Sequence, residues 1–284
     1  MRTYLISALA LFMLLSVAVA PSQASILYTV NGFGFGKIDT TTRVYTQIAA
    51  DAAFGNIRGN LAYNPGNDTF YTAARVAGGS FYVDTNLATI TRAGVVSAGY
   101  GPAKQQLMGL SFGPGGSPLS AITDEPKLQT IDPVTGVRTD LGDTAASPSF
   151  PGGAVYVGGS LYMAGVDGNT FSESLMRLDA PATDPTYSVV ADNSLFNQML
   201  LAWDGSSIYG IASQNTGELY RINPVDGAIT DLGAITGGVP WNLLGIAYAP
   251  DGPAAVPEPS TYALLCISLG VVGYARRKMV KSEE

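Results

Sequence analysis

Hydrophobic and polar positions alternate in short runs through the middle of the chain, and each run ends at a turn signal. The clearest stretch has four such runs, Leu200–Trp203, Ser207–Ile211, Glu218–Ile222 and Ile229–Gly233. β-branched and aromatic residues fill the runs, and pairs such as Asp226-Gly227 separate them, as in tightly turned strands. The pattern predicts a unit of four short strands.

This unit recurs five times between Ser25 and Gly252. Two sets of landmarks, an aromatic residue in the first strand and an Asp or Asn that ends the third, repeat at intervals of 44 to 49 residues. The aromatic residues are Tyr63, Phe112, Tyr156, Trp203 and Tyr248, and the polar residues are Asp39, Asp84, Asp132, Asp179 and Asn223. Four-stranded units of this length predict an all-β fold, a β-propeller.

The phase of the repeat predicts how the propeller closes. The last unit stops after its first strand, Gly245–Tyr248, and the missing second strand is found at Ile26–Val30. Pairing the two ends would complete a fifth four-stranded blade and remove exposed strand edges. We therefore expect one domain, residues 25–252, with five blades; the alternative is six blades, with a degenerate one in the region 91–106.

The sequence of the repeat resembles that of secreted NHL-like propellers. The resemblance rests on Ala249-Pro250-Asp251-Gly252 and on Trp203-Asp204-Gly205 before a tyrosine-bearing strand. Such short motifs occur in many propeller families, so the resemblance implies an architecture and no activity.

The N-terminal residues 1–24 have the composition of a secretory signal peptide. Arg2 precedes an apolar stretch from Tyr4 to Ala20, and small residues lead up to Ala24 and Ser25. These features predict export, with cleavage by signal peptidase between Ala24 and Ser25. The alternative is an uncleaved N-terminal anchor.

The C-terminal region combines three features in a fixed order. Residues 253–261 form a proline-rich linker, residues 262–275 an apolar segment, and residues 276–284 a basic tail. The order predicts a transmembrane helix with its basic tail in the cytoplasm. At 14 residues the segment would be about 21 Å long as a helix, shorter than the roughly 30 Å of a bilayer core. The alternative is a generic C-terminal anchor or a buried helix.

This order resembles the PEP-CTERM sorting signal of exosortase substrates. Pro257, Glu258 and Pro259 match the tripeptide, and Arg276 and Arg277 match the basic cluster. The resemblance implies a transient inner-membrane intermediate, processing by an exosortase-like enzyme, and delivery to the cell surface or extracellular matrix of a Gram-negative bacterium. It covers about the last 30 residues and implies nothing about the preceding domain.

Composition excludes several classes of function. A formal net charge of −7 argues against nucleic acid as a partner. The chain has no histidine, which removes Ser-His-Asp and Cys-His catalysis and histidine-ligated zinc. Its single cysteine, Cys266, cannot form an intramolecular disulfide. We predict no catalytic residues, no cofactor and no metal.

The candidate ligand face consists of the loops that lead into the innermost strands. Three of the five positions six residues before the landmark aromatics are amides, and the other two are Ile57 and Phe150. Amides suit sugar hydroxyls, and a nearby indole could stack on a pyranose ring. The candidate residues are Asn56, Gln106, Asn197, Trp241 and Asn242, with Arg58, Lys104 and Gln105 close by. The alternative is that the amides satisfy backbone groups where strands crowd the axis.

Other polar motifs are interpreted as turns. The repeated aspartates cap turns, and Asn31–Gly36 is a hairpin, since a phosphate loop requires a following helix. Asp167-Gly168-Asn169 and Gly66-Asn67-Asp68 have too few oxygen ligands for a calcium loop. These assignments favour a non-enzymatic protein that binds or organises extracellular material, with polysaccharide as the candidate ligand; the alternative is a secreted glycan hydrolase or lyase.

Overall fold

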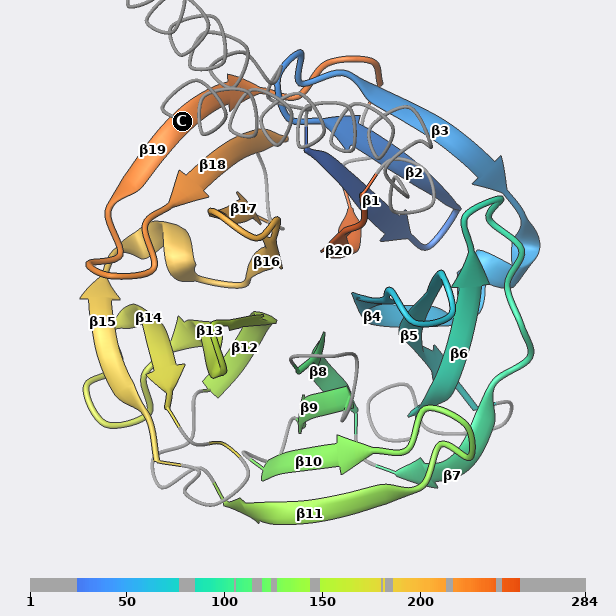
Figure 1. Cartoon of the computed structure of the whole chain (residues 1–284), viewed down its shortest axis with the longest axis horizontal. Coiled ribbons are helices and arrows are strands. Elements are labelled where there is room, and N and C mark those ends of the chain that lie inside the picture. The colour runs from blue at the N-terminus through green and yellow to red at the C-terminus, as the bar shows by residue number, and fades with distance from the viewer. Residues whose placement is uncertain are drawn as a thin grey trace, which may run out of the picture.

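A computed structural model describes residues 25–76, 85–104, 106–113, 119–123, 127–143, 149–179, 181, 186–212, 217–238 and 242–250. In these ranges, strands β1 to β20 form five four-stranded antiparallel sheets. The sheets surround a central axis as the blades of a propeller (Figure 1). The predicted all-β propeller is confirmed.

The first sheet joins the two ends of the domain. Its order is β20 (Leu243–Tyr248), β1 (Ile26–Asn31), β2 (Gly34–Asp39) and β3 (Tyr45–Ala50). Leu27 pairs with Tyr248 in an antiparallel ladder, and the Ala249 amide donates to the Ile26 carbonyl at 3.4 Å. The predicted closure by strands from both ends is therefore present.

Each of the other four sheets is built from consecutive strands. The second sheet contains β4 (Ile57–Asn64), β5 (Thr69–Arg75), β6 (Thr85–Thr91) and β7 (Tyr100–Lys104). The third contains β8 (Leu107–Phe112), β9 (Leu119–Thr123), β10 (Lys127–Ile131) and β11 (Arg138–Asp143). The fourth contains β12 (Ser149–Val157), β13 (Ser160–Val166), β14 (Glu173–Leu178) and β15 (Ser188–Asp192). The fifth contains β16 (Met199–Trp203), β17 (Ile208–Ala212), β18 (Glu218–Ile222) and β19 (Ile229–Ala234).

Two predictions about the repeat are wrong in the second sheet. The region 91–106, considered above as a degenerate sixth blade, supplies the outer strand β7 of the second sheet. The third strand of this sheet begins at Thr85, so Asp84 precedes it instead of ending it, and Asp84 itself lies outside the described residues. Thr91 ends the strand, and its hydroxyl accepts a hydrogen bond from the Val95 amide at 3.1 Å. A threonine thus caps this turn where other sheets use Asp or Asn.

The innermost strands of neighbouring sheets, β4, β8, β12, β16 and β20, pack against one another around the axis. Glycines allow this close approach. A Cβ atom on Gly245 would lie 2.5 Å from the carbonyl carbon of Asn60, and one on Gly153 would lie 2.5 Å from the Leu201 nitrogen. Neither space can hold a side chain, so glycine is required at both positions.

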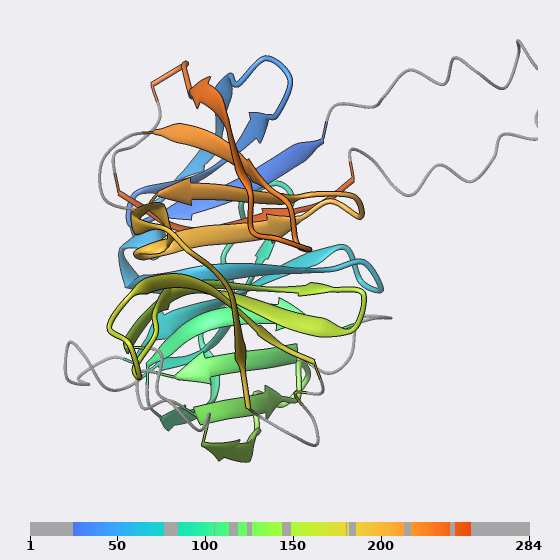
Figure 2. The same ribbon diagram turned by 90° about the vertical axis from the view of Figure 1, so that its left-hand side faces the viewer.

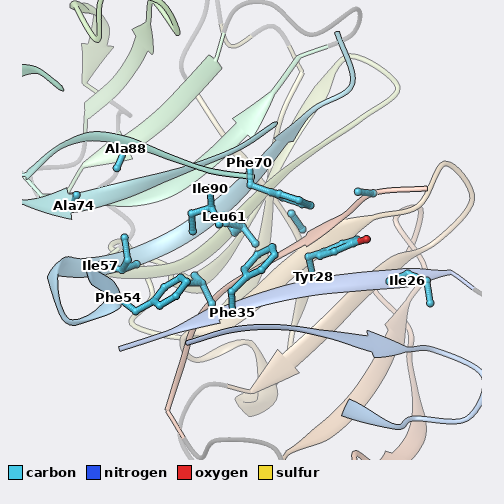
Figure 3. Packing of buried hydrophobic residues seen from close by; sticks show 13 residues of the cluster. Ile26, Tyr28, Phe35, Phe54, Ile57, Leu61, Phe70, Ala74, Ala88 and Ile90 are labelled. Atoms are coloured by element: carbon cyan, nitrogen blue, oxygen red, sulfur yellow. The ribbon is translucent and has the colours of Figure 1, made fainter. Parts of the chain in front are cut away.

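Hydrophobic side chains fill the space between neighbouring sheets. Between the first and second sheets, the rings of Tyr28, Phe35 and Phe70 pack with centroids 4.7 to 5.6 Å apart (Figure 3). At the rim of this cluster, Arg92 donates to the hydroxyl groups of Tyr28 at 2.9 Å and Tyr63 at 3.0 Å. Aromatic packing and this cation together fix the first sheet to the second.

The signal peptide at 1–24, the linker at 253–261, the apolar segment at 262–275 and the tail at 276–284 all lie outside the described residues. Within the described ranges, no helix has the length and apolar character needed to cross a membrane.

Candidate functional site

A polar cavity of about 270 Å³ lies at one end of the propeller axis. It is formed where the five innermost strands begin, so all five sheets contribute to it. Its described lining consists of Arg58, Gly59, Asn60, Gln106, Leu107, Met108, Gly152, Gln198, Leu200, Asn242, Leu243 and Leu244. A cavity with several convergent polar groups is the kind of site in which a small ligand binds.

Irregular backbone brings the polar side chains to the axis. The ladder between β4 and β5 shifts register on both sides of Gly59, and the β8–β9 ladder shifts between Leu107 and Gly109. Asn60 and Gln198 adopt positive φ angles of 57° and 51°, which are uncommon for residues with side chains. Bulges of this kind turn side chains away from the regular alternation of a strand. The lining is thus a product of the irregular starts of the innermost strands.

Arg58 lies beside a short 3-10 helix, η1 (Ala52–Asn56), that precedes β4. Asp51 caps this helix by accepting a hydrogen bond from the Ala53 amide at 2.8 Å. Nη1 of Arg58 donates to the carbonyl groups of Gly55 at 3.0 Å and Ile57 at 2.9 Å. These bonds hold the guanidinium at the edge of the cavity.

A second arginine, Arg75, lies close enough to Arg58 to affect its ionisation. Burial, and then the nearby charge of Arg75, lowers the pKa of Arg58 from its ordinary value. An arginine remains charged at neutral pH despite such a shift, because its ordinary pKa is above about 12. The cavity therefore carries a cation at the end of the second sheet.

Asn60 has a structural part in the cavity wall. The side chain is buried, and its amide nitrogen donates to the carbonyl groups of Leu107, at 3.5 Å, and Met108. The hydroxyl of Thr72 in turn donates to the carbonyl of Asn60 at 2.7 Å. Asn60 thereby joins the innermost strands of the second and third sheets, which matches the alternative that some amides satisfy crowded backbone.

The structure places the five predicted ligand-face residues in different surroundings. Gln106 and Asn242 line the cavity. Asn56 and Asn197 are exposed at the ends of 3-10 helices η1 and η3 (Ser194–Phe196), next to the cavity but outside its described lining. The amide of Asn197 donates to a carboxylate oxygen of Glu173 at 3.1 Å. Trp241 lies outside the described residues.

Sequence reasoning missed Asn60 and Gln198 and gave Arg58 only as a neighbour of the candidate residues. A fixed offset from the aromatic landmark could not find them, since bulges change the number of residues between the cavity and the landmark. Gly59-Asn60 is a signal in retrospect, because glycine and asparagine together favour positive φ.

The cavity at the opposite end of the axis is smaller and is lined mainly by apolar and aromatic residues. A cavity of about 130 Å³ is lined by the last residues of the same five strands, including all five landmark aromatics, Tyr63, Phe112, Tyr156, Trp203 and Tyr248. The described chain ends, near residues 25 and 250, lie on this side of the propeller (Figure 2). The polar cavity therefore opens on the side away from the chain ends.

Two of the repeated aspartates and Asn223 cap turns, whereas the carboxylate of Asp179 accepts hydrogen bonds from the Ser160 hydroxyl and from Nη2 of Arg177, both at 3.0 Å. Asp39 accepts hydrogen bonds from the amides of Thr41 at 2.8 Å and Thr42 at 2.9 Å, and Asp132 accepts one from Val134 at 2.8 Å. Asn223 does the same for the Val225 amide at 3.0 Å. The predicted turn-capping role is therefore confirmed at Asp39, Asp132 and Asn223.

The two acidic turns that were compared with calcium loops are bonded to protein donors. Asp167 accepts hydrogen bonds from the Asn169 amide at 2.9 Å and from the hydroxyl of Tyr187. Asp68 accepts hydrogen bonds from the hydroxyl of Tyr63 at 2.7 Å and from Nε of Arg92 at 2.5 Å. Among the described residues, no group of three or more acidic or cysteine side chains could hold a metal ion.

The fold and the cavity define a closed β-propeller with a polar axial site. The chain also matches the PEP-CTERM protein-sorting motif at residues 255–278, which implies an exported, surface-sorted protein of a Gram-negative bacterium and processing by an exosortase. The predicted sorting residues Pro257, Glu258, Pro259, Arg276 and Arg277 all fall within this match.

Solved structures support the propeller. A chain in the crystal structure of a nidogen/laminin complex is 12% identical, with a TM-score of 0.52 over 80% of this chain and 98% of that one. A protein of unknown function from Bacteroides thetaiotaomicron is 13% identical, with a TM-score of 0.51 over 75% of this chain and 56% of that one. The first similarity supports the β-propeller architecture. No curated protein matches the chain.

Proposed function

We propose that this protein is a surface-displayed binding component of the extracellular matrix, and that the polar axial cavity binds polysaccharide. The observation that carries the proposal is the position of this cavity, on the side of the propeller away from the chain ends. A chain held through its C-terminal signal would present that side outward.

The chemistry of the lining favours a sugar. The side chains of Gln106, Gln198 and Asn242 can both donate and accept hydrogen bonds, as sugar hydroxyls require. Hydrolysis of a glycosidic bond generally uses two carboxyl groups about 5 to 10 Å apart. The described lining contains no acidic residue. Binding is therefore a better match to the cavity than the alternative of a hydrolase or lyase.

Delivery of the protein would proceed in two steps. Signal peptidase would remove residues 1–24 during export, and an exosortase-like enzyme would process the chain at Pro257-Glu258-Pro259 while residues 262–275 lie in the inner membrane. The sorting-motif match at 255–278 supports the second step. The propeller would then remain at the cell surface or in the matrix.

A glycan array tests the binding role. The full chain, purified in a detergent without a sugar headgroup, should bind a subset of bacterial exopolysaccharide fragments and leave them uncleaved. Chromatography of the fragments after incubation detects cleavage. Absence of binding to every glycan, or conversion of the fragments to shorter products, would contradict the proposal.

A further inference from the structure

Two exposed aromatic side chains lie in turns between strands. Phe33, in the hairpin between β1 and β2, is 77% exposed, and Phe171, in the turn between β13 and β14, is 80% exposed. The other aromatic side chains whose burial the structure describes are buried or half-buried. Burial contributes little stability at these two rings, because the hydrophobic contribution scales with the apolar area removed from water.

Strand register places both turns at the polar end of the axis. Asn31 ends β1 and pairs with Leu243, which lines the polar cavity. Val166 ends β13 and pairs with Ser149 at the start of β12, the strand that brings Gly152 to the cavity lining. The turns that follow Asn31 and Val166 therefore lie on the side of the propeller on which this cavity opens.

The backbone at Phe171 is unfavourable for a residue with a side chain. Its φ is 57°, and its amide donates to the carbonyl of Asp167 at 2.8 Å. Gly136 and Gly227 hold the same position in two other turns, each with a φ of 70°, and the half-buried Arg43 holds it in a third, with a φ of 57°. Glycine adopts a positive φ without strain, whereas a bulky side chain does not. Phe171 thus combines a strained backbone with an exposed ring, and retained strain is typical of functional positions.

The separation of the two rings favours a linear ligand. Phe33 belongs to the first sheet and Phe171 to the fourth, and the fifth sheet lies between these two (Figure 1). A specific protein interface covers a continuous area of about 800 Å² on each partner. A pyranose ring with equatorial substituents needs much less, because its face of C–H groups covers a single aromatic ring. A polysaccharide can therefore contact separate rings with separate sugar units.

Size and charge narrow the class of polysaccharide. At about 270 Å³ the polar cavity is just below the roughly 300 to 1,000 Å³ that is typical of pockets for drug-sized ligands, so most of a polymer would lie outside it. The formal net charge of −7 opposes the approach of an acidic polymer. These properties favour a neutral chain. A β-linked chain of equatorially substituted pyranoses has the extended form that can reach from the axis to a hairpin.

We propose that the rings of Phe33 and Phe171 stack on sugar units outside the polar cavity, and that the ligand is a neutral, β-linked polysaccharide with equatorial substituents. This inference rests on the proposed binding function. It adds the chemical class of the polymer and two binding residues in the turns beside the cavity.

Calorimetry with two β-linked glucose oligomers, cellobiose and cellohexaose, tests this inference on the full chain. Cellohexaose should bind at least about tenfold more tightly than cellobiose, because additional contacts within one ligand form at high effective concentration. Phe171→Ala and Phe33→Ala should each weaken binding of cellohexaose by about two- to tenfold, the range of a lost aromatic stacking contact. The affinity for cellobiose, which is too short to extend far beyond the cavity, should stay unchanged.

Val225→Ala is the matched control. Val225 is 81% exposed in the turn between β18 and β19. That turn follows Ile222, which pairs with Ile208, and Ile208 pairs with Trp203 of the aromatic cavity. Loss of exposed apolar surface at this opposite end of the axis should leave both affinities unchanged.

Thermal unfolding distinguishes a binding role of Phe171 from a structural one. Phe171→Gly should weaken binding of cellohexaose as the alanine variant does, yet the midpoint of unfolding should be equal to or above that of the unmodified protein, because glycine relieves the strain of a positive φ. A fall of about 4 °C or more in either Phe171 variant would assign the ring to stability and overturn the inference.

The outcomes separate this inference from the proposed function. No binding of cellohexaose, equal affinity for the two oligomers, or unchanged affinity for cellohexaose in the folded Phe171→Ala variant would overturn the inference. The binding role would still stand if another glycan binds in the array. If the array shows no binding at all, the proposed function fails as well.

Discussion

Single residues determine how closely the sheets approach the axis. Gly245 and Gly153 lie where the backbone of a neighbouring innermost strand occupies the space of a side chain. The sequence shows many glycines, but their distribution between turns and close contacts appears only in the structure. At Gly32, by contrast, a Cβ atom would meet no heavy atom within 4 Å.

This contrast gives a matched pair of substitutions. Gly245→Ala should lower the free energy of unfolding by about 1 to 3 kcal/mol, because the added methyl group forces the β4 backbone to move. Gly32→Ala should change the stability by less than about 0.5 kcal/mol, as surface substitutions generally do. Chemical denaturation measures both values. Equal effects of the two substitutions would show that close packing at the axis does not limit stability.

Residue-level prediction from sequence succeeded where one turn motif repeats. Asp39, Asp132 and Asn223 cap turns as expected because an Asx side chain accepts hydrogen bonds from amides two and three residues ahead. The prediction was wrong at Asp84 because the third strand of the second sheet starts later, and Thr91 performs the same task. Both kinds of side chain accept a hydrogen bond from a turn amide, but they look different in a repeat search.

At the scale of elements, the N-terminal strand is fixed by more than its ladder. The hydroxyl of Ser25 donates to a carboxylate oxygen of Asp204 at 2.6 Å, in the turn between β16 and β17. The amides of Ser206 and Ser207 donate to the other carboxylate oxygen, both at 2.8 Å. This carboxylate therefore links the fifth sheet to the strand that closes the first.

The pKa of Asp204 makes this link dependent on pH. Partial burial opposes ionisation, but hydrogen bonds from Ser25, Ser207 and Ser206 outweigh it and lower the pKa from its ordinary value. A lowered pKa in the folded state adds stability above the unfolded-state value of about 3.9, and this stability is lost as pH falls through the folded-state value.

Asp204→Asn should therefore lower the midpoint of thermal unfolding at pH 7, with a loss of about 1 kcal/mol for hydrogen bonds to a charged group. The difference from the unmodified protein should shrink below about pH 4, where the carboxylate gains a proton. Asp226→Asn is the control, since Asp226 accepts a bond from Ala228 within its own exposed turn. A difference for Asp204→Asn that persists at pH 2.5 would contradict this interpretation.

The strands could be predicted because they repeat at a regular interval along the chain. Irregular backbone at the starts of the innermost strands limited the prediction of the cavity lining. The closing pair, β1 and β20, followed from the phase of the repeat, and each innermost strand carries its aromatic landmark near its end. The starts of the same strands contain bulges and positive φ angles, so positions counted back from the landmark do not coincide with the cavity. As a result Gln106 and Asn242 were found, whereas Asn60 and Gln198 were missed.

At the scale of the whole molecule, the two ends of the axis have different chemistry. The aromatic end lies on the side of the chain ends, and the polar end lies on the opposite side. Tyrosine and tryptophan are common near membrane interfaces, and hydrogen-bonding groups are required where a soluble sugar binds. The orientation proposed above, with the chain ends toward the membrane, agrees with this division.

The sorting signal and the propeller should act independently. Replacement of Pro257-Glu258-Pro259 by three alanines should leave export and folding unchanged and block processing at the C-terminus, because the altered residues are separate in sequence from both the signal peptide and the described propeller. Mass measurement of the exported protein checks this, with replacement of Ser282-Glu283-Glu284 by alanines as the control. Normal trimming of the Pro-Glu-Pro variant would show that the tripeptide is not the recognised signal.

The location of a bound oligosaccharide tests the central claim most directly. We predict that a crystal structure of the protein with an oligosaccharide that binds in the glycan array has one sugar ring inside the polar cavity, with its hydroxyls at Gln106, Gln198 or Asn242. A sugar bound at the aromatic end, or on the outer strands of the sheets, would contradict the account.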